Sequence, residues 1–146
     1  MMTKYHLIFH FSRYRGPIMD QTTQTAKPLV AGKKKYGIRV TEYVRENYKT
    51  PLILEEVSAH FKLNKCYFCS VLKKELGKTF SQLVNEIRIE KSKELLLENK
   101  LSIFDIAIAV GFNNQNYFNM AFKKLTGLTP LTYRRLGGKS PDQLTA

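Results

Sequence analysis

The chain contains an internal repeat, and this repeat strongly limits the folds that it can adopt. Positions 67–79 match positions 117–129 at a constant offset of 50 residues. The matched residues are Tyr67-Phe68 with Tyr117-Phe118, Lys73-Lys74 with Lys123-Lys124, Gly77 with Gly127, and Thr79 with Thr129. In each copy a helical stretch ends at a glycine, which favours a left-handed stop. The repeat therefore predicts two similar units, each a short helix, a tight turn, a second helix and a glycine stop.

Apolar periodicity predicts an all-α fold between residues 33 and 136, with no strand. The seven expected helices are Lys34 to Asn47, Leu54 to Phe61, Lys65 to Leu76, Thr79 to Glu98, Ser102 to Gly111, Gln115 to Thr126, and a last one from Pro130. The expected N-caps are Asn64, Thr79, Ser102, Asn114 and Thr129, and Gln82 completes a capping box with Thr79. The pattern indicates two helix-turn-helix subdomains joined by a long central helix.

The same pattern divides the chain into three regions. Residues 1–32 are expected to form a flexible lead, because glycine, proline and polar runs interrupt the periodicity, and either Met1 or Met19 suits the start of translation. Residues 33–136 form the helical domain, with a first subdomain at 33–78, a linker helix at 79–98 and a second subdomain at 99–136. Residues 137–146 are expected to be a disordered tail.

The apolar residues of three helices define their expected buried faces. These are Ile38, Val40 and Val44 in the first helix; Leu83, Ile87, Leu95 and Leu96 in the long helix; and Tyr117, Phe118, Ala121, Phe122 and Leu125 in the Gln115–Thr126 helix. In the last of these, Gln115, Asn116, Asn119 and Met120 then lie toward the opposite side.

The charge balance points to a polyanionic partner. Lys and Arg number 24 against 12 acidic residues, which gives a formal net charge of +12. Such an excess favours nucleic acid, or less specifically an anionic membrane surface, and the plain alternative is a solvated basic surface without a partner. No apolar run approaches the roughly 20 residues that span a bilayer, and no signal-peptide core is present. We therefore expect a cytoplasmic protein that does not contact membranes.

Residues 36–135 resemble the DNA-binding domain of the AraC/XylS family of bacterial transcription regulators. The matching motif residues are Ile103, Ile106-Ala107, Val110-Gly111-Phe112, Gln115 to Phe118, Phe122 to Lys124, Gly127, Thr129-Pro130 and Tyr133-Arg134, with a weaker match over Leu54 to Val57, Leu63-Asn64, Tyr67-Phe68, Lys73 to Glu75 and Arg88-Ile89. The resemblance implies a homeodomain-like pair of helix-turn-helix units, promoter or operator DNA as partner, and activation through contact with RNA polymerase. Repression by occlusion stays open, and neither a cofactor nor a metal is expected.

The second helix of each unit is the expected recognition helix, because that helix enters the major groove. By the family motif, the base-facing residues are Gln115, Asn116, Asn119 and Met120 in the second unit and Cys66, Cys69 and Ser70 in the first. Asn and Gln suit adenine, whereas the first set is short, so we expect more base readout from the second unit. The phosphate candidates are Asn64, Lys65, Lys73, Arg88, Asn114, Lys123 and Lys124, with an ordinary solvated face as the alternative for each.

The linker helix has a length that fits two grooves. Thr79 to Glu98 is 20 residues, or about 30 Å, against about 34 Å for one turn of the duplex. A monomer is then sufficient to read a split site in successive major grooves, although an oligomer is compatible with the sequence.

Two other functions compete with this interpretation. Cys66 and Cys69 form a Cys-x-x-Cys pair, which is compatible with a redox- or metal-responsive switch. Zinc needs about four ligands, however, and two small residues on a groove-facing helix are the favoured explanation of the pair. The other alternative is a basic protein that binds nucleic acid without sequence preference. An enzyme is the least favoured class, because Ser70 has no histidine or carboxylate nearby in the sequence pattern.

Overall fold

The computed structural model describes residues 35–144. Within that range the chain forms eight helices and no strand. The helices are α4 (Tyr36–Asn47), α5 (Leu54–His60), α6 (Lys65–Leu76), α7 (Phe80–Glu98), α8 (Ile103–Ala109), α9 (Gln115–Thr126), α10 (Pro130–Arg135) and α11 (Pro141–Leu144). The predicted flexible lead, residues 1–32, and the end of the predicted tail lie outside the described residues.

The all-α fold is confirmed, with the seven predicted helices present as α4 to α10. The sequence does not predict the short helix α11, which lies in the segment expected to be disordered. This single turn is formed by local bonds: Pro141 occupies its first position, where a missing N–H costs nothing, and the Ser140 N–H donates to Gln143 Oε1 at 3.0 Å.

The predicted caps of the two recognition-type helices are present. Asn64 Oδ1 accepts from the Tyr67 N–H at 2.9 Å, and Asn114 Oδ1 accepts from the Tyr117 N–H at 2.8 Å. At the other ends, Gly77 and Gly127 have φ values of +72° and +83°. A side chain at either glycine would meet no atom within 4 Å, so backbone conformation alone favours glycine there.

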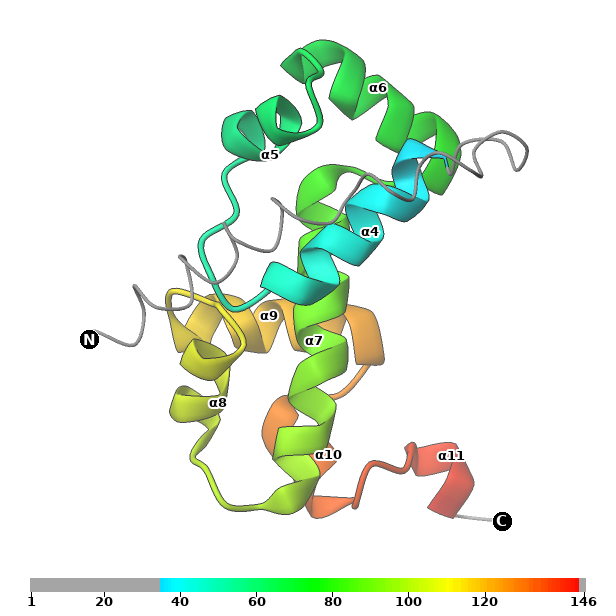
Figure 1. Ribbon diagram of the computed structural model, residues 1–146. Helices are drawn as coiled ribbons and strands as arrows, with labels where there is room; N and C mark the ends of the chain where they lie inside the picture. The colour runs from blue at the N-terminus through cyan, green and yellow to red at the C-terminus, as the bar shows by residue number, and fades with distance from the viewer. Residues whose placement is uncertain (1–34, 145–146) are drawn as a thin grey trace, which may run out of the picture. The chain divides into compact units, whose positions relative to one another are not determined.

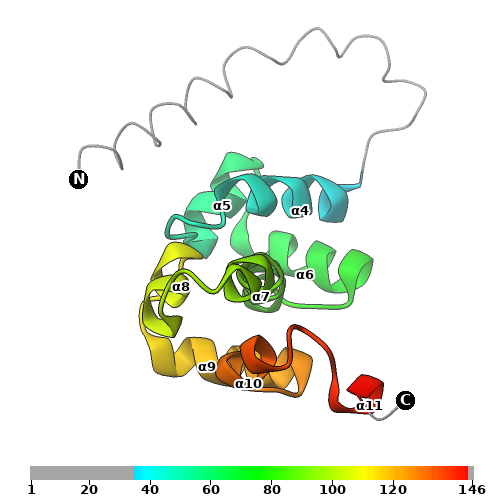
Figure 2. The ribbon, with the colours of Figure 1, turned by 90° about the horizontal axis from the view of Figure 1, so that it is seen from below.

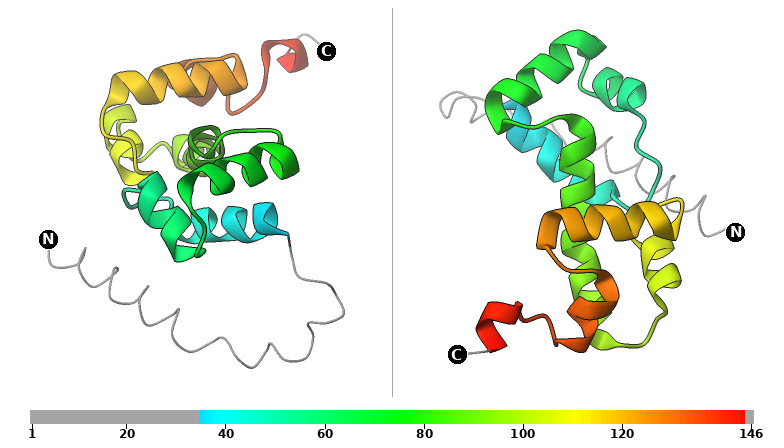
Figure 3. Two further views of the ribbon diagram at one scale, coloured as in Figure 1. Left: turned by 90° about the horizontal axis from the view of Figure 1, so that it is seen from above. Right: turned by 180° about the vertical axis from the view of Figure 1, so that it is seen from behind.

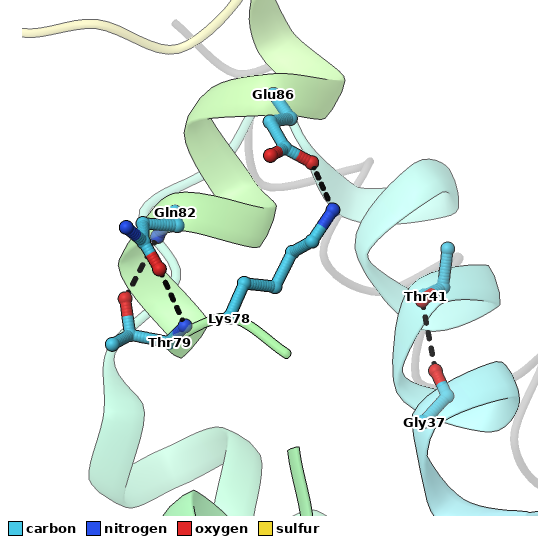
Figure 4. A network of polar contacts seen from close by, with 6 residues as sticks. All are labelled: Gly37, Thr41, Lys78, Thr79, Gln82 and Glu86. Atoms are coloured by element: carbon cyan, nitrogen blue, oxygen red, sulfur yellow. Dashed lines mark hydrogen bonds and ion pairs between the residues drawn. The ribbon is translucent and has the colours of Figure 1, made fainter. Parts of the chain in front are cut away.

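The start of α7 is fixed by reciprocal side-chain bonds, as Figure 4 shows. Thr79 N–H donates to Gln82 Oε1 at 2.8 Å, and Gln82 N–H donates to Thr79 Oγ1 at 3.2 Å, which is the predicted capping box. Lys78, just before the helix, pairs with Glu86 at 2.5 Å. These contacts set the direction in which α7 leaves the first subdomain.

Two separate hydrophobic cores hold the helices together. Core 1 comprises Val40, Val44, Val57, Phe61, Phe68, Leu72, Phe80, Leu83, Val84 and Ile87. Core 2 comprises Ile89, Leu96, Ile106, Ala107, Val110, Phe112, Phe118, Ala121 and Phe122. Each core therefore belongs to one helix-turn-helix subdomain, and α7 contributes to both.

The double use of α7 explains where its predicted buried face is incomplete. Leu83, Ile87 and Leu96 are buried as expected, whereas Leu95 is half-buried. Ile89 and Ser92, which the single-stripe pattern does not include, are buried as well. A helix that packs against different neighbours along its length buries more than one side, so one stripe cannot describe it.

In α4 the predicted stripe holds for Val40 and Val44, which are both fully buried, but Ile38 is 48% exposed. The adjacent Gly37 packs closely on α6, where a Cβ would come within 2.9 Å of the Leu76 side chain. Ile38 lies two positions from the buried Val40, about 200° around the helix, and therefore faces the solvent side.

Figure 1 shows α7 as the central helix of the described unit. In the two views along α7, α4 lies on one side of it, and α9 and α10 lie on the opposite side (Figures 2 and 3). Seen from behind, α6 and α9 run in roughly the same direction, α6 near the start of α7 and α9 across its middle (Figure 3). The two recognition-type helices are thus displaced from each other along α7.

Candidate nucleic-acid interface

The first turns of α6 present the residues that the sequence predicts to face bases. Cys66, Cys69 and Ser70 are all exposed, and neither cysteine is in a disulfide. Cys66 and Cys69 are three residues apart and therefore lie on one face of the helix. This face offers small side chains with weak hydrogen-bonding capacity.

Lys65, at the first position of α6, pairs with Glu55 of α5 at 2.7 Å. The hydrogen bond and the charge of Lys65 lower the pKa of the Glu55 carboxyl, and the same contact raises the pKa of Lys65. Both groups are well exposed, so solvent screens the pair and its contribution to stability is small. A phosphate group at this helix start would compete with Glu55 for Lys65.

The corresponding turns of α9 are more polar. Asn116 is exposed and Met120 is 67% exposed. Gln115 and Asn119 are half-buried, and Asn119 Oδ1 is fully covered without a hydrogen-bond donor among the described residues. Of the four predicted base-facing residues, Asn116 and Met120 are therefore the most accessible.

Backbone groups at both helix starts add to this surface. Asn64 and Asn114 each satisfy the third N–H of their helix, and the first two N–H groups have no partner within the helix. Such open N-termini attract anions. The N-termini of α6 and α9 occupy equivalent positions in the repeat. Each unit therefore offers the same kind of phosphate-binding candidate.

The remaining lysine candidates lie near the other ends of the same helices. Lys73, Lys123 and Lys124 are exposed in the last turns of α6 and α9. Cations at this end also complement the helix dipole, so a structural role explains their position without DNA.

Arg88 differs from the other phosphate candidates in what its side chain contacts. Its Nε donates to Tyr48 O and its Nη2 to Thr50 O, both at 2.9 Å. Burial lowers its pKa, which reflects a guanidinium partly removed from solvent. Because two of its N–H groups bind backbone carbonyls, we infer a structural role for Arg88 in place of the predicted phosphate contact.

Two exposed tyrosines were missed as candidates. Tyr117, which the apolar stripe predicts to be buried, is 46% exposed, and its repeat partner Tyr67 is 52% exposed. The Tyr117 hydroxyl accepts a hydrogen bond from Asn85 Nδ2 of α7 at 2.8 Å, and its ring lies edge-on to the core 2 residue Phe112, 5.7 Å between centroids. Leu125, also expected inside, is 44% exposed. The repeat contains a signal for these tyrosines as interface candidates, because both copies carry a tyrosine at the same position of the first turn.

No group of three or more potential metal ligands occurs among residues 35–144. In that same range no helix is both long and apolar enough to cross a membrane.

Comparison with known proteins decides the family. The model of a helix-turn-helix domain family matches residues 57–136. The chain belongs to the AraC-type helix-turn-helix family. This confirms the resemblance found in the motif residues of α8 to α10.

Three relatives place the family membership in context. The chain is 29% identical over 129 residues to the melibiose operon regulatory protein of Escherichia coli K12, covering 88% of this chain and 43% of that protein. It is 37% identical to the C-terminal domain of AraT, a response regulator from Geobacillus stearothermophilus, with a TM-score of 0.67 over 74% of this chain and 90% of that domain. The DNA-binding domain of AdpA, solved with a target DNA, has the same fold at 18% identity, with a TM-score of 0.65 over 70% of this chain and 93% of that domain.

These findings support DNA binding in the regulation of transcription. This AraC-type chain spans less than half of the length of the melibiose regulator.

Proposed function

We propose that this chain is a sequence-specific regulator of transcription that inserts α6 and α9 into successive major grooves of duplex DNA. The observation that carries the proposal is the repeated geometry: two capped helices with exposed polar first turns lie along one central helix. The nineteen residues of α7 give it a length of about 28 Å, close to one turn of the duplex. The relative AdpA, which shares the fold, was solved on a target DNA.

The two helices contribute unequally in this proposal. The accessible Asn116 on α9 can bond the edge of adenine, and Met120 can touch a thymine methyl. On α6, the equivalent surface holds Cys66, Cys69 and Ser70, which have short reach. Lys65, Lys73, Lys123 and Lys124, with the open helix N-termini, then contact phosphates and fix the register.

The effect on transcription is activation through contact with RNA polymerase, and a monomer is sufficient for DNA binding. A promoter reporter in cells that express the full chain tests the sign of regulation. Increased output that depends on the bound site supports activation, whereas decreased output shows repression by occlusion.

Selection of bound duplexes from a random library tests the DNA-binding proposal directly. We expect an asymmetric site with two separated half-sites, bound at least about 1000-fold more tightly than random duplex. A ratio near one between the selected and random duplexes would replace this proposal with that of a non-specific basic nucleic-acid-binding protein.

A redox-responsive variant of this function is favoured by one observation: Cys66 and Cys69 are both exposed on the face of α6 assigned to DNA. An added disulfide oxidant would remove two protons and two electrons from the pair and close a bond over that face. We then expect weaker binding that a reductant reverses and that Cys66→Ser prevents. Equal affinity of the wild-type chain under oxidant and reductant would exclude the switch.

A further inference from the structure

Arg88 lies at the point of α7 where the two cores meet. Its neighbour Ile87 belongs to core 1, and its other neighbour Ile89 belongs to core 2. Through Nε and Nη2 it binds the carbonyls of Tyr48 and Thr50, which lie in the segment between α4 and α5. Tyr48 itself packs against both cores. Arg88 therefore ties the central helix to the first subdomain beside the boundary with the second.

The second subdomain reaches the same point through the turn between α8 and α9. The Arg88 guanidinium lies 5.8 Å from the centre of the Phe112 ring, within the range of a cation–π contact. A Cβ on Gly111 would lie 2.4 Å from Tyr48 O and 2.7 Å from Arg88 Nε. The turn, the guanidinium and the α4–α5 segment are thus in close contact. We refer to Tyr48, Thr50, Arg88, Gly111 and Phe112 as the subdomain joint.

The internal repeat provides a comparison for this turn. Lys62 occupies the place of Gly111 in the first unit and also has a positive φ, +60°. The local hydrogen bonds agree: Lys62 N–H donates to Ala59 O at 2.8 Å, and Gly111 N–H donates to Ile108 O at 3.0 Å. Lys62 is exposed. A residue with a side chain can therefore make this kind of turn, and the lack of space against Tyr48 and Arg88 is specific to the second unit.

A guanidinium at this position gives directional contacts that an apolar residue would not. Partial removal of the Arg88 guanidinium from solvent costs free energy, which the two carbonyl bonds offset. The planar fork holds two acceptors in a fixed geometry, whereas the lysine ammonium is a single point donor. The joint is thus suited to fixing an angle as well as filling space.

We propose that Arg88 is a positioning residue that sets the distance and angle between α6 and α9, and thereby the half-site spacing that the protein accepts. The inference rests on the proposed two-groove function. One inserted base pair moves a half-site by about 3.4 Å along the duplex and about 35° around it. A rigid joint penalises that displacement, and a loosened joint tolerates it.

The test uses the full chain and the duplex selected from a random library. That duplex is compared with versions in which one or two base pairs are inserted or deleted between the half-sites. The variants are Arg88→Met, which keeps length but removes the donors, and Arg88→Lys, which keeps the charge but not the fork. Lys93→Met is the matched control, because it removes one positive charge from another half-buried position of the same helix, where Lys93 pairs with Glu90 at 3.5 Å. Circular dichroism identifies which variants are folded. If Arg88→Met does not fold, the result for Arg88→Lys is used instead.

We expect the wild-type chain and Lys93→Met to lose at least about tenfold in affinity when the spacing changes. For Arg88→Met the loss falls to about threefold or less, with Arg88→Lys in between. If folded Arg88 variants bind every duplex more weakly but keep the wild-type preference for spacing, the role of Arg88 is overturned and the two-groove function is not. A wild-type chain that binds all spacings equally would overturn the two-groove function and the inference with it.

Discussion

Gly111 and Gly77 both adopt positive φ, but they respond differently to a side chain. At Gly77, with φ +72°, a Cβ meets nothing within 4 Å, so Gly77→Ala costs only the left-handed conformation, about 1–2 kcal/mol. At Gly111, with φ +104°, the same change also drives a Cβ into Tyr48 O and Arg88. We expect Gly111→Ala to be clearly the more destabilising, as measured by urea unfolding. Equal losses for the two variants would show that the joint is looser than described.

Base recognition is also decided by single residues. We expect Asn116→Ala to reduce discrimination against a changed base pair by about 1–3 kcal/mol. Ser70→Ala, on the corresponding face of α6, should reduce base discrimination less, because the serine side chain is short. Competition between the selected duplex and single-base variants measures both. A larger loss for Ser70→Ala or Cys66→Ala than for Asn116→Ala would reverse the assignment of the two units.

At the scale of the helical elements, the contact between α5 and α6 limits the charge available to DNA. Glu55→Gln should free Lys65 and raise DNA affinity a few-fold, measured by titration at fixed salt. Glu56→Gln is the control, because it removes the same charge from the next exposed position of α5. An equal gain for both variants would mean that only net charge matters.

The effect of pH on this pair follows from the signs of the shifts. The pKa of Glu55 is lowered, so its pairing is complete above the usual glutamate range and is lost only as pH falls through the lowered value. The pKa of Lys65 is raised, so its contribution persists until pH rises above the usual lysine range. The gain in affinity from Glu55→Gln should therefore be constant between about pH 6 and pH 8.

The sequence predicts those features of the helices that depend on local chemistry. Asn64, Asn114 and the Thr79–Gln82 pair cap their helices as expected, because caps involve residues three positions apart. Features that depend on contacts between distant elements cannot be predicted from the sequence pattern. Tyr117 is only partly covered, and its hydroxyl accepts a hydrogen bond from Asn85 of α7, 32 residues away in the sequence. Ile89 is buried because a second core follows the first along α7.

The candidate interface shows the same division. The exposure of Cys66, Cys69, Ser70, Asn116 and Met120 agrees with the helical period. The two carbonyl bonds of Arg88 are not predicted, because their acceptors are 38 and 40 residues away in the sequence. No periodicity contains that information.

For the whole molecule, the phosphate contacts predict a salt dependence. If Lys65, Lys73, Lys123 and Lys124 all contact phosphates, the slope of log affinity against log salt is about −3 to −4. Each lysine changed to methionine should make that slope shallower by about 0.9, whereas Arg88→Met should leave it unchanged. Titrations over a range of potassium chloride concentrations measure it. If none of the four substitutions changes the slope, these lysines do not contact phosphates.

The sharing of α7 between two cores has a consequence for how the molecule melts. From α7, core 1 takes Phe80, Leu83, Val84 and Ile87, and core 2 takes Ile89 and Leu96. Any cut within α7 therefore divides a helix that both subdomains use. The two helix-turn-helix units are therefore not expected to fold independently of each other. Heat should disrupt residues 36–135 in one cooperative transition, and amide exchange in α6 and α9 should slow or quicken together when α7 is altered.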